Sequence, residues 1–143
     1  VHDGVRPLVS NELIVRVRDT AQDYGAAIPV VDILDSLREL VICGGCEEPG
    51  RAVGSRIIDR NAFRAVQTPQ FFKKDILLEA YEQDYNDSFT DDASVVEAAG
   101  YTVTLVRGET RNIKVTTPTD LVIVAALLEE ESGSRSVSGK NNH

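Results

Sequence analysis

The chain opens with Val1-His2-Asp3-Gly4-Val5-Arg6-Pro7 (VHDGVRP), and this stretch decides how the rest of the sequence is interpreted. A carboxylate and a guanidinium closed off by glycine and proline are typical of a loop that leaves the carboxyl end of a strand, where open α/β sheets bind their ligands. Only Val1 precedes the loop. We therefore expect the middle of an α/β domain, with a sheet that is incomplete at its N-terminal side.

Downstream of this loop, apolar residues at helical spacing alternate with short apolar runs. Ser10 is a good N-cap for a helix that Gly25 ends, and the nearly continuous apolar run from Ala26 to Val31 is typical of a buried strand. Further strands are expected at residues 63–67, 101–107 and 111–116, and further helices at 73–85, after Thr90 and from Thr117. This alternation predicts an α/β fold with a mostly parallel sheet.

Residues 33–60 interrupt the alternation. Two moderately apolar segments, Leu34 to Ile42 and Val53 to Asp59, flank a cluster of turn-forming residues, which predicts a long β-hairpin. Between two buried sheet elements such a hairpin has to project as an arm, and an isolated two-stranded ribbon is marginal in water. We therefore expect the second subunit of a homodimer to cover it. Cys43 and Cys46 at its tip are interpreted as two exposed thiols, because no second pair of zinc ligands accompanies them.

Length and composition are those of a single folded domain. The chain has 143 residues, of which 42% are apolar, and we expect residues 1–131 to form part of one domain and residues 132–143 to be a disordered tail. The net charge of -8 argues against a nucleic-acid partner, since neutralising phosphates along a backbone needs a basic face. No apolar run reaches the roughly 20 residues that cross a bilayer, so a cytoplasmic protein without a membrane partner is expected.

Residues that could carry chemistry lie at strand exits and turns. They are Asp3, Arg6, Arg60, Thr68, Thr90 and Lys114. Three cations and two hydroxyls at such positions suit a phosphate group, while the carboxylate of Asp3 could accept hydrogen bonds from polyol hydroxyls or help to hold a divalent cation. Taken alone, each of four of these residues also fits an ordinary surface, edge, turn or capping role: Arg60, Lys114, Thr68 and Thr90. Taken together, they predict an anion-binding α/β protein.

Four segments, in the order VHDGVRP, DRNAFRAVQTPQFF, FTDDAS and RNIKVTTPTDL, resemble the signature segments of the 2-C-methyl-D-erythritol 4-phosphate cytidylyltransferases of non-mevalonate isoprenoid biosynthesis. The similarity runs from Val1 to about Leu128. It implies a Rossmann-like fold of the nucleotidyltransferase type. It also implies a homodimeric transferase that joins CTP to methylerythritol phosphate, releases pyrophosphate and uses Mg²⁺ to screen the triphosphate.

The resemblance also implies roles for single residues. Asp3, Lys114 and Arg60 would be catalytic, Asp3 would also be the metal contact, and Gly4 would lie near the cytidine. The residues implied to bind the polyol phosphate are Asp3, Arg6, Ser36, Arg60, Thr68, Thr90 and Lys114. Arg60 follows the arm and would therefore act in the partner's site. Ser36 stands where the family often has threonine, and the hydroxyl is retained.

The family's N-terminal half carries a glycine-rich loop that cradles the triphosphate, and the only paired glycines here, Gly44 and Gly45, lie in the arm. The chain is therefore expected to be the C-terminal part of such an enzyme and to be inactive alone. Two alternatives stay open. Ribitol-5-phosphate cytidylyltransferases have similar HD-x-x-RP and TPQ segments, and the chain could also be a non-catalytic module for dimerisation and polyol-phosphate binding.

Overall fold

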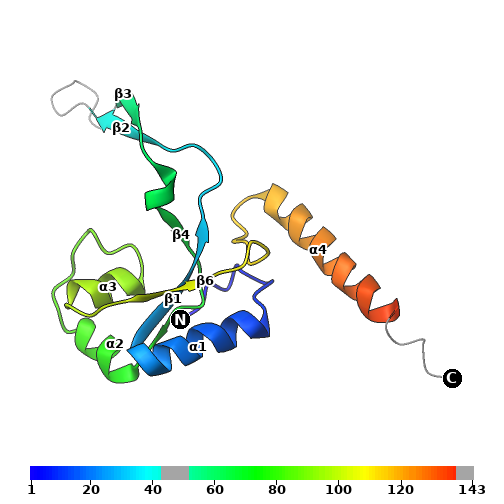
Figure 1. Ribbon diagram of the computed structural model, residues 1–143, viewed down its shortest axis with the longest axis horizontal. Helices are drawn as coiled ribbons and strands as arrows, with labels where there is room; N and C mark the ends of the chain where they lie inside the picture. Colours follow the sequence, from blue (N-terminus) through cyan, green and yellow to red (C-terminus); the bar gives the residue numbers. More distant parts are fainter. Residues whose placement is uncertain (43–51, 138–143) are drawn as a thin grey trace.

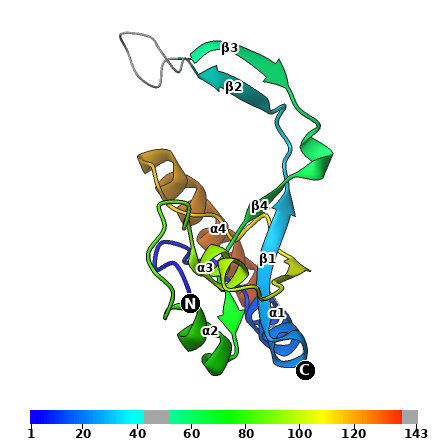
Figure 2. The ribbon, with the colours of Figure 1, turned by 90° about the vertical axis from the view of Figure 1, so that its left-hand side faces the viewer.

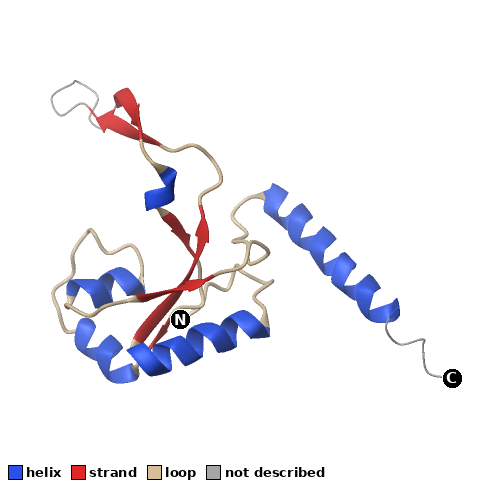
Figure 3. Ribbon diagram, viewed as in Figure 1, coloured by secondary structure: helices blue, strands red, loops and turns tan. Residues whose placement is uncertain are grey.

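The computed structural model describes residues 1–42 and 52–137, and a four-stranded sheet lies at the centre of its body (Figure 1, Figure 3). The strands are β1 (Ala26–Asp32), β4 (Arg64–Val66), β5 (Phe71–Phe72) and β6 (Thr104–Arg107). β1 pairs with all three of the others. It is therefore the strand around which the sheet is built.

The sheet is mixed within the described residues, which corrects the expectation of a mostly parallel sheet. β1 runs parallel to β6 but antiparallel to β4 and β5. Val30 pairs with both Val66 and Arg107, so β4 and β6 lie on opposite edges of β1. Ala27 pairs with both Phe71 and Thr104, which places β5 on the same edge as β4. Between β1 and β4 the chain passes through the strands β2 and β3 and not through a crossover helix. A strand that returns to the sheet in this way is antiparallel to the one before it.

Helices cover both faces of the sheet. Alternate side chains of β1 point to opposite faces, so Ala26 and Ile28 pack on one side and Ala27 on the other. The first side carries α2 (Lys74–Ala80) and α3 (Asp92–Ala98), and the second carries α1 (Asn11–Tyr24). The result is a three-layer α/β/α body, in agreement with the expected fold class.

The helix expected after Ser10 is present as α1. The hydroxyl of Ser10 accepts a hydrogen bond from the backbone N–H of Leu13 at 3.0 Å. Gly25 ends the helix at φ 99°, where a Cβ would lie 2.8 Å from Ile76 Cδ1. Glycine is required here both by the left-handed backbone and by the close approach of α2.

Two antiparallel strands occur where the long hairpin was expected. β2 (Arg38–Ile42) and β3 (Ala52–Ile57) form a separate two-stranded sheet, and every residue of both strands is exposed. Figures 1 and 2 show this sheet beyond the end of β1, away from α1, α2 and α3. The expectation about Cys43 and Cys46 falls outside the described residues.

Several boundaries differ from the expected ones. α2 ends at Ala80 and not near Tyr85, since the side-chain amide of Gln83 donates to the carbonyls of Ala80 and Val95 and turns the chain back. The helix expected after Thr90 is α3, which begins at Asp92 and is capped by Asp91. Residues 111–116 form a loop and not a strand; the backbone bond that joins them to the opening loop runs from Val115 N–H to the Val5 carbonyl at 2.8 Å.

The last helix, α4 (Pro118–Val137), begins as expected and ends later. The carboxylate of Asp120 accepts from the backbone N–H groups of Thr116 and Thr117 at 2.9 and 2.7 Å. The described part of α4 runs to Val137. Among the described residues, no helix combines the length and apolarity that a membrane span needs.

Candidate functional site

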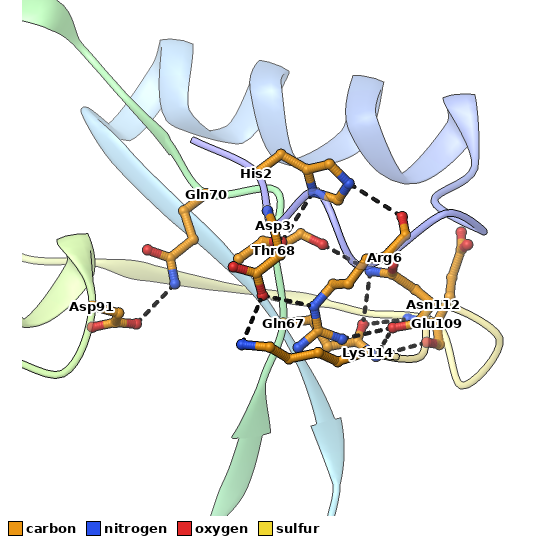
Figure 4. Close-up of polar contacts among 10 residues, drawn as sticks. All are labelled: His2, Asp3, Arg6, Gln67, Thr68, Gln70, Asp91, Glu109, Asn112 and Lys114. Atoms are coloured by element: carbon orange, nitrogen blue, oxygen red, sulfur yellow. Dashed lines mark hydrogen bonds and ion pairs between the residues drawn. The ribbon is translucent and has the colours of Figure 1, made fainter. Parts of the chain in front are cut away.

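The opening loop is fixed beside the connection between β4 and β5. The N-terminal amine of Val1 donates to the carbonyl of Gln70 at 2.7 Å, and the N–H of Gln70 donates back to the carbonyl of Val1 at 2.8 Å. A turn then follows, closed by Arg6 N–H to the Asp3 carbonyl at 3.1 Å. This pairing brings the side chains of Asp3 and Arg6 next to Thr68, as Figure 4 shows.

Asp3, Arg6 and Lys114 form one charged cluster. Oδ2 of Asp3 lies 3.3 Å from Arg6 Nε and 3.3 Å from Lys114 Nζ. Arg6 is also anchored from Nη1 to the backbone carbonyl of Asn112 at 2.7 Å. One carboxylate between two cations leaves a net positive charge, although the whole chain carries -8. The cluster is therefore a local position of positive charge on an acidic protein.

The side chain of Asp3 is ionised at neutral pH. Partial burial is the largest single influence and acts to raise the pKa, but the hydrogen bonds and charges of Lys114 and Arg6 together outweigh it and lower the pKa of Asp3 below its ordinary value. The side chain of Arg6 is 10% exposed and that of Lys114 is 48% exposed. Arg6 is thus a fixed charge, whereas Lys114 can turn toward a ligand.

The buried side-chain amides of Gln67 and Asn112 support the cluster. Gln67 Nε2 donates to the carbonyls of Glu109 and Asn112 at 2.8 and 3.2 Å, and its Oε1 accepts from the N–H of Glu109 at 3.2 Å. Asn112 Nδ2 donates to the Thr68 carbonyl at 2.8 Å. The two side chains join the loop that bears Lys114 to the segment that bears Thr68. Sequence reasoning missed both, although each lies inside a quoted motif: Gln67 directly precedes Thr68, and Asn112 stands two residues before Lys114.

Gly108 permits this contact. A Cβ at this position would lie 2.5 Å from Gln67 Oε1 and 3.0 Å from the Val30 carbonyl. Only glycine leaves room for the amide of Gln67 between β1 and the loop that follows β6. The glycine after β6 therefore has a packing role.

Thr68 and His2 make the third part of the site. The hydroxyl of Thr68 accepts from the backbone N–H of Asp3 at 2.9 Å and lies 2.9 Å from His2 Nδ1. The peptide bond between Thr68 and Pro69 is cis. Gly4, the expected nucleotide contact, is exposed, and a Cβ there would meet no other atom within 4 Å. The space beside Gly4 is open.

Thr90 is connected to this cluster through its neighbour. Gln70 is 2% exposed, and its Nε2 donates to Asp91 Oδ2 at 2.8 Å. Thr90 itself is exposed and stands one residue before Asp91, the cap of α3. The predicted set of Asp3, Arg6, Thr68 and Lys114 is therefore brought together, with Thr90 at its margin.

Arg60 and Ser36 lie elsewhere in the described structure. Both line a small hollow at the base of the β2–β3 hairpin, formed with Ile57, Ile58, Asp59 and Asn61. Arg60 begins a short 3-10 turn, Arg60–Ala62, and its guanidinium donates to the carbonyl of Leu34. Within one subunit these two residues do not join the cluster around Asp3.

A protein-held metal does not fit this arrangement. Oδ2 of Asp3 is already shared by two cations, which oppose the approach of a third positive charge. Within residues 1–42 and 52–137, no three or more histidine, cysteine or acidic side chains gather as a metal-binding set.

Comparison with known proteins gives a consistent picture. The family model described as 2-C-methyl-D-erythritol 4-phosphate cytidylyltransferase matches residues 1–130. A protein of that name from Phocaeicola vulgatus is 49% identical over 128 residues, covering 90% of this chain and 54% of the relative. One from Bacteroides fragilis is 48% identical with the same coverage. The chain thus spans about half the length of the curated relatives it matches.

The fold is also similar to solved structures. The crystal structure of 2-C-methyl-D-erythritol 4-phosphate cytidylyltransferase from Thermus thermophilus superimposes with a TM-score of 0.70 at 41% sequence identity, covering 90% of this chain and 60% of that one. A structure described as 4-diphosphocytidyl-2C-methyl-D-erythritol synthase gives a TM-score of 0.71 at 32% identity, with 90% and 55% covered.

Proposed function

This chain belongs to the 2-C-methyl-D-erythritol 4-phosphate cytidylyltransferase family, and we propose that it supplies the polyol-phosphate side of an active site that joins CTP to that substrate. The family resemblance read from the sequence is confirmed. The observation that carries the proposal is the cluster in which Asp3 lies between Arg6 and Lys114. A carboxylate accepts hydrogen bonds from hydroxyls, and adjacent cations attract a phosphate, so the cluster matches both ends of a polyol phosphate.

In the proposed reaction the substrate phosphate attacks the α-phosphorus of CTP and pyrophosphate leaves. Lys114 turns from Asp3 to the substrate phosphate, because it is half exposed and held by a single ion pair. Arg6 keeps its bonds to Asp3 and to the Asn112 carbonyl and acts as a fixed positive charge. Catalysis then rests on positioning and electrostatic stabilisation of the phosphates. Gly4 and Thr90 flank this position, toward the nucleotide and the polyol respectively.

The proposal includes a homodimer in which the β2–β3 hairpin is the projecting arm. All residues of β2 and β3 are exposed, and a two-stranded ribbon of this kind is marginal unless another surface covers it. Arg60 and Ser36, at the base of that hairpin, lie apart from Asp3 in one subunit. We assign them to the partner's site, where Arg60 would add a second guanidinium to the phosphate. The cytoplasmic location expected from the sequence is part of the same proposal.

Mg²⁺ is proposed to accompany the triphosphate of CTP. The described residues offer Asp3 alone, and that carboxylate already lies against two cations. Phosphate oxygens are strong ligands for Mg²⁺, which commonly keeps several waters and few protein ligands. Asp3 is therefore assigned first to the polyol hydroxyls.

Calorimetric titration of the chain with 2-C-methyl-D-erythritol 4-phosphate tests the proposal. The expected result is saturable binding that Lys114→Met weakens about 10- to 100-fold, the range for losing a charge-assisted hydrogen bond. Lys74→Met, an exposed lysine on α2, is the matched control and should bind as the wild type does. Tighter binding of ribitol 5-phosphate, or equal loss in both variants, would contradict the assignment.

A further inference from the structure

We propose that His2 is a positioning residue of this site: in the neutral form of its imidazole, Nδ1 accepts a hydrogen bond from the hydroxyl of Thr68, so that Thr68 offers the ligand a hydrogen-bond acceptor and not a donor. The inference rests on the proposed function for the identity of the ligand. The arrangement of protons rests on the contacts of His2 and Thr68 alone.

The contact with Arg6 fixes the tautomer of His2. Its Nε2 lies 3.3 Å from the backbone carbonyl oxygen of Arg6. A carbonyl oxygen can only accept, so Nε2 must carry the proton in this contact. In the neutral imidazole, Nδ1 is then an acceptor. The opposite tautomer would place two lone pairs against each other.

The contact with Nδ1 fixes the hydroxyl of Thr68. The Thr68 oxygen lies 2.9 Å from His2 Nδ1 and 2.9 Å from the backbone nitrogen of Asp3. A threonine hydroxyl has one proton and two lone pairs. The hydroxyl donates its proton in a hydrogen bond to Nδ1 of His2, and one lone pair accepts a hydrogen bond from the N–H of Asp3. One lone pair remains for a ligand.

This arrangement divides the site into two ends. Asp3 places its Oδ2 between the cations, while its Oδ1 has no protein hydrogen bond within the described residues. Asp3 Oδ1 and Thr68 Oγ1 are thus both acceptors, on two residues that a hydrogen bond joins, and acceptors favour hydroxyl donors and disfavour phosphate oxygens. The phosphate belongs to the Lys114 end. Thr68 is thus a contact for the polyol chain. The sequence alone had instead suggested that its hydroxyl adds a neutral donor to the phosphate.

Nitrogen-15 NMR of the His2 ring tests the proton arrangement without any ligand. At a pH where the imidazole is neutral, the chemical shifts should show Nε2 protonated and Nδ1 unprotonated, with His143 as the internal reference for a second histidine in the same chain. Thr68→Val removes the hydroxyl and should shift the Nδ1 signal while Nε2 stays protonated. A protonated Nδ1, or an Nδ1 signal that Thr68→Val leaves unchanged, would overturn the inference.

Two substitutions of His2 separate its contacts. In His2→Asn the shorter amide can place an oxygen near the position of Nδ1 and keep the acceptor for Thr68. In His2→Gln the longer amide reaches toward the Arg6 carbonyl and loses that acceptor. The expected result is that His2→Gln weakens binding of 2-C-methyl-D-erythritol 4-phosphate about fivefold to tenfold, the value of one neutral hydrogen bond, and that His2→Asn restores it. Binding of inorganic phosphate should be equal in all three proteins.

The two proposals fail in different ways. If the wild-type chain binds no polyol phosphate, the proposed function fails, while the NMR result still decides the arrangement of His2. If the chain binds the polyol phosphate and His2→Gln weakens inorganic phosphate equally, Thr68 serves the phosphate end and the inference is wrong.

Discussion

At the residue scale, the ionisation of Asp3 is the property on which the site depends. Hydrogen bonds and charge from Lys114 and Arg6 lower its pKa against the opposing effect of burial. The carboxylate stays charged at neutral pH because both of its partners are cations, one of which is fixed by a further contact. Arg6 is held by the carbonyl of Asn112.

Removal of Lys114 should therefore raise the pKa of Asp3. In Lys114→Met the hydrogen bond and charge of the lysine are lost, while burial and Arg6 remain, so the pKa moves upward toward the ordinary range of an aspartate. NMR titration of the Asp3 carboxyl carbon measures the change. Lys74→Met should leave the titration unchanged, and an Asp3 pKa that does not rise in Lys114→Met would show that the ion pair is not formed in solution.

Gly108 should be intolerant of a side chain. Gly108→Ala places a Cβ against Gln67 Oε1 and the Val30 carbonyl, so the free energy of unfolding should fall by about 1–3 kcal/mol, the cost of overpacking a well-filled interior. Denaturant unfolding measures it. Gly4→Ala is the matched control: a Cβ there meets nothing within 4 Å, and its stability should be that of the wild type. Equal stability of the two variants would contradict the packing role of Gly108.

At the element scale, α4 depends on the first turn that Asp120 closes. The carboxylate accepts from the backbone of Thr116 and Thr117, and these bonds lower the pKa of Asp120 to about 2. A carboxylate with a lowered folded pKa stabilises the fold above its unfolded pKa and loses that contribution as the pH falls through the folded value.

Acid should therefore release the start of α4. The contribution of Asp120 should decline from its ordinary pKa of 3.8 and be lost as the pH passes about 2. Circular dichroism of wild type and Asp120→Asn between these values measures it: the difference in helical signal present near neutrality should disappear at the acid end. A difference that persists unchanged across the range would exclude the carboxylate as the cause.

At the scale of the whole molecule, the central sheet and the β2–β3 hairpin differ in how far other elements cover them. α1, α2 and α3 cover the central sheet, but β2 and β3 make a separate exposed sheet. Large apolar side chains on the hairpin, such as Leu40 and Val53, are 58% and 60% exposed. The proposed homodimer gives these side chains a cover.

Shortening the hairpin should abolish the dimer. Replacing residues 36–58 by a short glycine-serine linker removes the exposed strands and leaves β1, β4 and the cluster around Asp3 intact. Light scattering should then report a monomer, where the wild type reports a dimer. A second variant, Leu40→Ser with Val53→Ser, keeps the hairpin length and should weaken association without abolishing folding. Association that neither change affects would place the dimer contact elsewhere.

The sequence by itself determined the local features of this protein. Ser10, Gly25 and the helix start at Thr117 were assigned correctly, because capping and helical periodicity act over a few residues. The four motifs also identified the family, and the selected residues Asp3, Arg6, Thr68 and Lys114 do meet.

Only the tertiary structure decided how those residues are held. Arg6 bonds Asn112 across 106 positions, and Gln67 bonds it across 45. Neither Gln67 nor Asn112 can be selected from the local sequence, because the path of the chain and not the neighbouring residues sets their hydrogen-bond partners. For the same reason the sheet proved mixed: whether β4 returns parallel or antiparallel to β1 depends on the connection between them, while burial alone gives both arrangements the same apolar pattern.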